Sequence, residues 1–460
     1  MIERVLLAVV TVVVISLIVL IMRRTRGTSI LGWQVGVFAI AVNPAVYFLD
    51  FFLGNAFSPM TPYSDIEIRI FRAILLSNCI AIGYLAVLLG VLQRRNRITP
   101  KETGACATRP AVFWLLSAFA LTGILLELTT SQFQLVLHEG IATIGNYEEY
   151  YKVRGEVSTM TPDLLHQHIF AMSVVVCLPL VVLFSFQQFL LWRTRRWLWR
   201  WIVLAILWSL NSVLIYQKSP IVVVIVGHLA VLLLTLVSRP IKLRQLLMYG
   251  FAATIVAFGL VHGVYVVLGA SSSLSESFLL LCDRIWGIPM YTTYYHFYIF
   301  PDFSEHTRYS MSTTMNLLLG GGKRVDTGGL LPYEVASSII VGTAFDMNSG
   351  FLGSCWAELG YVGVMEGALI IFGVCFLWDV YFLRHRGVSA RALLCAFFVG
   401  YSFNIVNISL LAMLLPGGLI LAPIYTLFLF RSAAGPARFE LRKQKLLPAN
   451  AQLLDRKQGA

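Results

Sequence analysis

The residue least easily explained by folding alone is Lys218, in the stretch YQKSPIVVV at 216–224. It is the only charged residue among the 38 from Trp201 to Ser238. A lysine at the centre of a membrane costs about 2.5–3.5 kcal/mol, so we expect Lys218 at a turn between two apolar helices. At the membrane surface its ammonium group either binds an anion or extends towards lipid headgroups without a further role.

Two carboxylates, Asp346 and Glu358, stand near the start of a long apolar run, twelve residues apart. On a helix, Ser354 would share a face with Glu358 because it lies four residues earlier. Burial of Glu358 beside apolar Trp356 and Leu359 would raise the pKa of its carboxyl group. A carboxyl group with a raised pKa is a candidate general base. The alternative is a helix-packing carboxylate that is hydrogen-bonded within the bundle.

Further cations lie in two polar stretches. Guanidinium groups grip phosphate oxygens in pairs, which makes Arg154 and Arg284 candidates for an anion site. A solvated ion pair with a neighbouring acid, Glu156 or Asp283, is the competing role. The other candidates follow the second of these arginines, the last two of them in a glycine-rich stretch that could close over a substrate. They are Arg308, Lys323 and Arg324.

The composition shows what must position these side chains. The chain has 460 residues, of which 58% are hydrophobic and 13% charged, and a mean hydropathy of +0.77. That leaves too little polar surface for a soluble globule and predicts an all-α polytopic membrane protein. Apolar runs long enough to cross about 30 Å of hydrocarbon recur along the chain. We predict eleven spans, at 5–22, 30–53, 72–92, 111–130, 168–192, 201–216, 220–237, 246–269, 351–383, 392–414 and 416–430.

The charges alternate between the two sides of these spans. The connections that would share one side hold 25 of the 35 Lys and Arg residues but only three of the 23 acids. The positive-inside bias makes that side cytoplasmic. The net charge of +12 is then mainly a topology signal, and no nucleic-acid partner is expected. The N-terminus is predicted to be periplasmic and the C-terminus cytoplasmic.

Most of the polar chain then lies outside the membrane, on the periplasmic face. We predict one transmembrane domain over 1–430, with periplasmic loops at 131–167 and 270–349, and a basic cytoplasmic tail at 431–460. Six aromatic residues between 291 and 300 would either stack on sugars or anchor a helix in the membrane interface. His296 and His306 are further candidate bases, although a histidine beside tyrosines is more often structural. The seven cysteines are scattered, and no metal site is expected.

Three stretches resemble the O-antigen or oligosaccharide repeat-unit polymerases, the Wzy type, of bacterial envelopes. They are QKSP at 217–220, YKVRGE at 151–156 and SGFLGSCWAELGYVGVM at 349–365. In the last, residues 357–360 match the family's run of a small or aromatic residue, an acid, an apolar residue and a glycine. The plan of spans and loops extends the resemblance over most of the chain.

The resemblance implies glycosyl transfer at the periplasmic face of the bacterial inner membrane. A glycan chain moves from undecaprenyl pyrophosphate to one lipid-linked repeat unit, without a cofactor. The pyrophosphate leaving group needs fixed cations, and the acceptor hydroxyl needs a base. Expected partners are the undecaprenyl-pyrophosphate-linked glycan, membrane lipids and a chain-length regulator. The base would be Glu358 or Asp346, and the cations Lys218, Arg154, Arg284, Arg308, Lys323 and Arg324.

Two other functions remain open. An O-antigen ligase transfers to a different acceptor and usually has a histidine near the end of the large loop. Here that region reads TAFDMNSG at 343–350, without a histidine, which favours the polymerase. A flippase or transporter of lipid-linked glycans tends to show paired repeats with broken spans, and we find no such internal symmetry.

Overall fold

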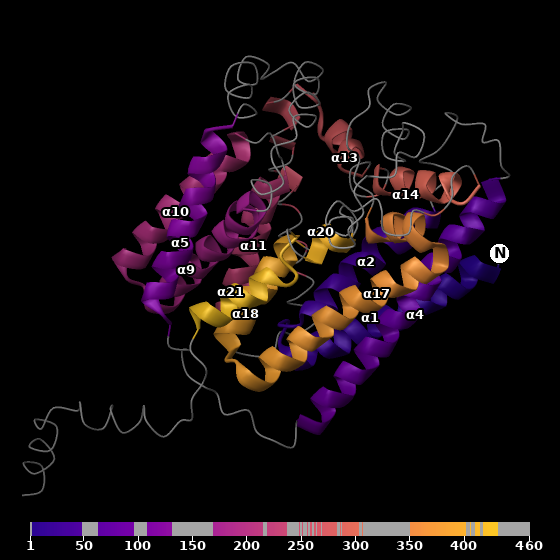
Figure 1. Cartoon of the computed structure of the whole chain (residues 1–460), viewed down its shortest axis with the longest axis horizontal. Helices are drawn as coiled ribbons and strands as arrows, with labels where there is room; N and C mark the ends of the chain where they lie inside the picture. The colour runs from indigo at the N-terminus through magenta and orange to yellow at the C-terminus, as the bar shows by residue number, and fades with distance from the viewer. Residues whose placement is uncertain are drawn as a thin grey trace, which may run out of the picture.

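The computed structural model is built from α-helices (Figure 1). In the part of the chain that it describes, the only strand-like pairing is an isolated bridge between Thr108 and Phe430. The described residues are 2–47, 63–95, 108–130, 169–214, 219–236, 269–282, 288–302, 350–401, 410–414 and 417–430, with isolated positions between 248 and 267 and at 286, 306 and 405.

Among the described residues, five helices are long and apolar enough to cross a membrane. This supports the expected all-α, multi-pass membrane protein. All five fall on predicted spans, and the helix at 63–95 begins nine residues before the predicted start at 72. They are α1 (Ile2–Thr25), α4 (Tyr63–Arg95), α5 (Pro110–Leu128), the continuous pair η2 (Ala171–Cys177) and α9 (Leu178–Trp192), and α17 (Phe351–His385).

Other helices lie in most of the remaining predicted ranges, so the total of eleven spans stays a prediction. Of the range 246–269 the structure describes only separate positions. The last two predicted spans contain helices of 14, five and nine residues. These other helices are α2 (Ile30–Tyr47), α10 (Arg195–Leu214), α11 (Ser219–Leu236), α18 (Val388–Tyr401), α20 (Leu410–Leu414) and α21 (Leu421–Leu429).

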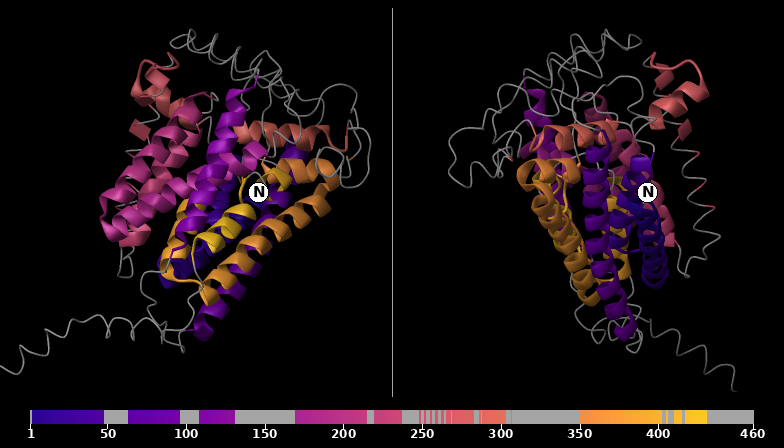
Figure 2. Two further views of the ribbon diagram at one scale, coloured as in Figure 1. Left: turned by 60° about the vertical axis from the view of Figure 1, so that its left-hand side comes forward. Right: turned by 90° about the vertical axis from the view of Figure 1, so that its right-hand side faces the viewer.

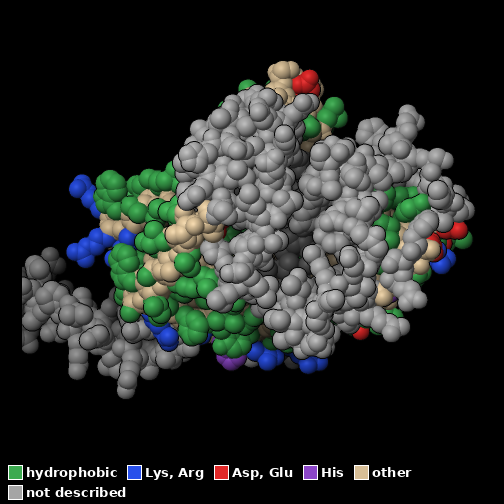
Figure 3. Space-filling view, turned by 45° about the horizontal axis from the view of Figure 1, so that its top comes forward, with side chains coloured by type: hydrophobic (Ala, Val, Ile, Leu, Met, Phe, Trp, Pro, Cys, Tyr) green, Lys and Arg blue, Asp and Glu red, His purple; other side chains and the backbone are tan. Residues whose placement is uncertain are grey.

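The basic ends of several helices meet at one end of the bundle, which we call the basic end. The backbone N–H of Arg109, before α5, donates to Leu429 at the end of α21. Arg386, after α17, donates to the carbonyl of Phe430 at 3.2 Å. Arg200 of α10 lies over the ring of Trp114 of α5, at 4.8 Å. In Figure 3 basic side chains line the left and lower edges of the molecule.

Helices α1, α4 and α17 run in the same direction and begin at the opposite end. Arg4 of α1 pairs with Glu67 of α4 near both starts. Farther along, the hydroxyl of Tyr84 in α4 donates to the carbonyl of Leu369 in α17 at 3.3 Å. Both views of Figure 2 show α4 and α17 side by side along much of their length. Acidic and basic groups occur together at this end, which we call the mixed-charge end.

A buried carboxylate joins α17 to the start of α2 near the basic end. Asp379 accepts the hydroxyl of Ser29 at 2.6 Å and the backbone N–H groups of Ile30 at 2.8 Å and Leu31 at 3.1 Å. The first N–H groups of a helix have no partner inside the helix, and its positive dipole end favours an anion. Asp379 therefore acts as a helix cap supplied from another helix.

Two short helices, α13 (Leu274–Cys282) and α14 (Ile288–Ile299), belong to the second predicted loop. In Figure 1, α14 lies across the mixed-charge end, and it packs on α2, α4 and α17. Four of the six aromatic residues considered from the sequence, Tyr294, Tyr295, Phe297 and Phe300, are buried in the protein, so these four neither stack on a sugar nor anchor a helix in lipid. The first loop, 131–167, and the tail, 431–460, lie outside the described residues.

Candidate functional site: the break in α17

Helix α17 is broken at Leu359 and Gly360, directly after Glu358. Leu359 has φ −146° and ψ 19°, and Gly360 has φ 60° and ψ −137°. Residues with a Cβ rarely adopt the backbone conformation of Gly360. The break divides α17 into a short segment, 351–358, and a long segment, 361–385. Glu358 is the last residue of the short segment, as the expected half-helix requires.

The short segment folds back onto the long one. In a straight helix, residues eight apart are separated by about 12 Å along the axis. Yet a methyl group added at Gly363 would overlap the carbonyl oxygen of Cys355 and lie 3.1 Å from its carbonyl carbon. One at Gly367 would lie 3.3 Å from the ring of Phe351. Glycines on the long segment therefore create the space in which the short segment lies.

Helix α14 holds the short segment from its other side. The ring of Phe297 stacks on Trp356 with centroids 4.1 Å apart. The indole N–H of Trp356 donates to the carbonyl of Phe300 at 2.9 Å. Stacked aromatic pairs and buried indole bonds of this kind fix a side chain's rotamer. Glu358, two residues after Trp356, is thereby placed on a supported backbone.

His306 occupies the break itself. Because residues 359 and 360 are not helical, the regular hydrogen bonding around the carbonyl of Ala357 is interrupted. Nδ1 of His306 lies 3.3 Å from that carbonyl oxygen, so the Nδ1–H donates to it. A Cβ at Gly360 would lie 3.1 Å from Nε2 of His306, so glycine leaves room for the ring. The imidazole is thus hydrogen-bonded to Ala357, the residue before Glu358.

Ion pairs from α1 and α4 surround the same end. Arg69 grips Asp302, after α14, with two contacts of 2.9 and 3.3 Å, a bidentate arrangement. Arg72 is 3.9 Å from the carboxylate of Glu3. Together with the pair Arg4–Glu67, these residues form what we call the mixed-charge cluster: Glu3, Arg4, Glu67, Arg69, Arg72 and Asp302.

Glu358 itself is half-buried. Ser354 is expected from the sequence to share a helix face with Glu358. Its hydroxyl lies 3.1 Å from the carbonyl oxygen of Phe351 and 3.3 Å from that of Gly350. Ser354 therefore bonds to the backbone of its own helix. The half-buried position gives Glu358 both solvent access and an apolar flank, which a carboxylate base requires.

His296 is a structural histidine. It is 2% exposed, and its Nδ1–H donates to the carbonyl of Thr292 at 2.6 Å within α14. Burial lowers the pKa of its imidazole to about 4, although the bond to Thr292 acts in the opposite direction. A histidine that stays neutral inside the protein does not reach a substrate.

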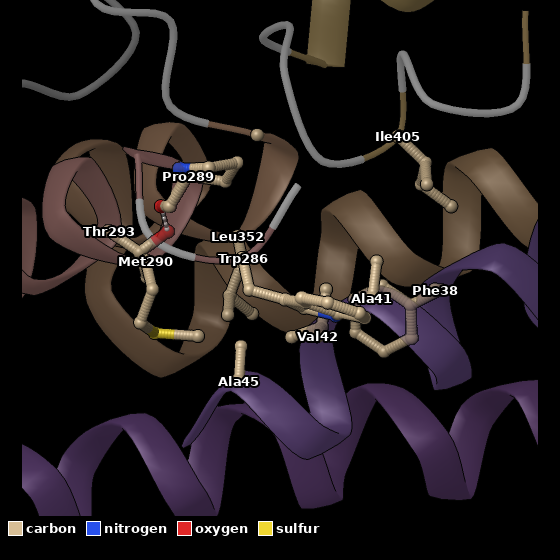
Figure 4. A pocket seen from close by; sticks show the side chains of 11 residues that line it. Phe38, Ala41, Val42, Ala45, Trp286, Pro289, Met290, Thr293, Leu352 and Ile405 are labelled. Carbon is tan, nitrogen blue, oxygen red and sulfur yellow. Dashed lines mark hydrogen bonds between the residues drawn. The ribbon is translucent and has the colours of Figure 1, made fainter. Parts of the chain in front are cut away.

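An apolar pocket lies at the other end of α14, between α2 and the start of α17 (Figure 4). Its walls include Phe38, Met290 and Leu352, and its volume of 20 Å³ is room for about one water molecule. It cannot hold a sugar or a lipid chain in this form, so it is not the candidate site.

Of the residues expected from the sequence, the structure places Glu358. The other expected site residues lie outside the described residues, so their roles stay predictions: Asp346, Lys218, Arg154, Arg284, Arg308, Lys323 and Arg324. Sequence reasoning missed Arg69 and Arg72, although both belong to the few cations away from the basic end. Arg69 lies just before the predicted span at 72–92 and Arg72 begins it. That position was the available signal, and it gave no indication that α4 lies beside α17.

No protein-family model, no curated protein and no solved structure matches this chain. The assignment of function therefore depends on the residues and geometry of the break.

Proposed function

We propose that the protein is a membrane glycosyltransferase that polymerises undecaprenyl-pyrophosphate-linked oligosaccharide repeat units into an O-antigen-type polysaccharide. The observation that carries the proposal is the half-buried Glu358 at a break in α17, with cations of α4 at the same end of the bundle. A carboxylate beside fixed cations suits a transfer whose acceptor loses a proton and whose leaving group is an anion.

In the proposed reaction, Glu358 accepts the proton of the acceptor sugar hydroxyl. The hydroxyl oxygen forms a bond with the anomeric carbon of the donor glycan. The bond from that carbon to the pyrophosphate oxygen breaks, and undecaprenyl pyrophosphate leaves with its electron pair. Neighbouring cations stabilise the negative charge of this leaving group.

The proposal also includes the number of membrane spans and their orientation. Eleven spans place the N-terminus and the mixed-charge end in the periplasm, and the basic end in the cytoplasm, as the positive-inside bias favours. The protein then resides in the bacterial inner membrane and takes both substrates from its outer leaflet. A chain-length regulator is a further proposed partner.

One observation favours a second candidate, an O-antigen ligase. Ligases usually have a histidine near the end of the large loop, and the sequence shows none between 343 and 350. In the structure His306, from an earlier part of that loop, lies against the backbone of Ala357 beside Glu358. A histidine that is distant in the sequence therefore occupies a comparable place.

A lipopolysaccharide gel from a strain lacking this chain separates the candidates. Loss of the ladder with a single repeat retained indicates a polymerase. Loss of all repeats, including the first, indicates a ligase or a flippase and would contradict the proposal. Restoration of the ladder by the full chain, supplied on a plasmid, controls for effects on neighbouring genes.

A further inference from the structure

The three arginines of the mixed-charge cluster differ in how far neighbouring acids neutralise them. Arg69 is held by both oxygens of Asp302, and Arg4 pairs with Glu67. Arg72 is 3.9 Å from Glu3, a longer separation than that of the Arg69–Asp302 pair, and the side chain of Arg72 is 60% exposed. A loosely paired, exposed guanidinium is the one of the three best able to accept an external anion.

Tyr361 lies beside Arg72. It is the first residue of the long segment of α17 and three positions after Glu358, and its side chain is close to Arg72 and Arg69. It is 37% exposed, and its ring contacts Trp356 edge-on at 4.9 Å. Its hydroxyl and the Arg72 guanidinium thus present hydrogen-bond donors together at the outer end of the seam between α4 and α17.

The surface below these donors is apolar along both helices. On α17, Val362, Met365 and Leu369 are 51%, 39% and 42% exposed. On α4, Cys79 and Gly83 are exposed on the same face of the helix as Arg72, seven and eleven residues after it. A methyl group at Gly83 would meet nothing within 4 Å. The exposed surface below Arg72 and Tyr361 is therefore apolar on α17 and carries small residues on α4, and the two helices pack against each other.

We propose that Arg72 and Tyr361 bind the pyrophosphate head of an isoprenoid lipid, and that the lipid tail lies along the exposed apolar surface of α4 and α17 below them. The inference rests on the proposed function for the identity of the lipid. The occupant must combine an anionic head with a long hydrocarbon chain, because a cation and a hydroxyl stand at the top of an otherwise apolar, laterally open surface. This site puts the pyrophosphate at the break, beside Glu358, where the glycosyl bond is cleaved.

The test measures binding without turnover. The purified full chain in nanodiscs is titrated with undecaprenyl pyrophosphate, with inorganic pyrophosphate and with phosphatidylglycerol. We expect undecaprenyl pyrophosphate to bind more tightly than either of the others. Arg72→Gln should weaken that binding about ten- to a hundredfold, the range expected for loss of a charge-assisted hydrogen bond. Arg72→Lys should retain part of the affinity, and Tyr361→Phe should lose several-fold.

The matched control is Arg94→Gln, which removes the same charge from the exposed other end of α4 and should leave binding unchanged. Equal affinity of Arg72→Gln and the parent would overturn the site, as would phosphatidylglycerol binding that matches undecaprenyl pyrophosphate. Failure of the site and failure of the function are distinguishable. Lipid binding at Arg72 in a protein that makes no polymer would refute the function alone, whereas normal polymerisation by Arg72→Gln would refute the site alone.

Discussion

The two segments of α17 touch at Gly363. We therefore predict that one added methyl group, in Gly363→Ala, has a large effect on stability and activity. The added Cβ would overlap the Cys355 carbonyl oxygen and lie 3.1 Å from its carbon, where ordinary contact needs 3.4–4 Å. Because both partners are backbone, the short segment must retreat by about 1 Å. Overpacking of this kind costs about 1–3 kcal/mol. A displacement of about 1 Å at a reacting group can lower the rate about a hundredfold.

The assay compares Gly363→Ala with Gly90→Ala on α4, whose methyl group meets nothing within 4 Å. Thermal unfolding in detergent gives the loss of stability, and ladder length normalised to membrane protein gives activity. We expect Gly363→Ala to be less stable and about a hundredfold less active. Gly90→Ala should match the activity of the parent and equal its stability or gain up to about 1 kcal/mol. Wild-type stability and ladder length in Gly363→Ala would refute the folded-back short segment.

Three further predictions concern other parts of the protein. Asp379→Asn should lower the free energy of unfolding by about 1.5–3 kcal/mol, because an amide cannot accept all three bonds at the start of α2; unchanged denaturation would show that the cap contributes nothing. His296 has its pKa lowered by burial from 6.5 to about 4, so its contribution is present above pH 6.5 and is lost as the pH falls towards 4. His296→Asn keeps a donor but does not titrate, and should lose about 3 kcal/mol less stability than the parent between pH 7 and pH 4; equal losses would contradict this. Reporters fused at Tyr150 and Gly322 should be periplasmic and one fused after Arg244 cytoplasmic, and a cytoplasmic signal from Gly322 would invalidate the proposed orientation.

The helical architecture was predictable because a membrane imposes a length on every apolar run. The helices at 110–128 and 171–192 match the expected spans within about three residues at each end. The start of α4 was placed too late, because Asp65, Glu67 and Arg69 interrupt the apolar run although they continue the same helix. Hydropathy reports where a helix enters hydrocarbon, whereas hydrogen bonding decides where the helix begins.

The candidate site was predictable only in part. The half-helix ending at Glu358 could be anticipated from a local motif, and Gly360 provides the unusual backbone that breaks it. The contacts that build the site are not local: Arg69 meets Asp302 across 233 residues, and His306 reaches Ala357 across 51. Such pairings depend on how helices pack, and a single sequence carries little information about packing partners.

The central claim, that Glu358 is the base of the transfer, is tested most directly by Glu358→Gln. The amide keeps the shape of the side chain and removes its proton affinity. The control is Glu276→Gln, an exposed carboxylate on α13 that accepts hydrogen bonds from Ser272. With both proteins present in the membrane at equal amounts, we predict single-repeat product from Glu358→Gln and a normal ladder from Glu276→Gln. A wild-type ladder from Glu358→Gln would contradict the account and shift the assignment of the base to Asp346.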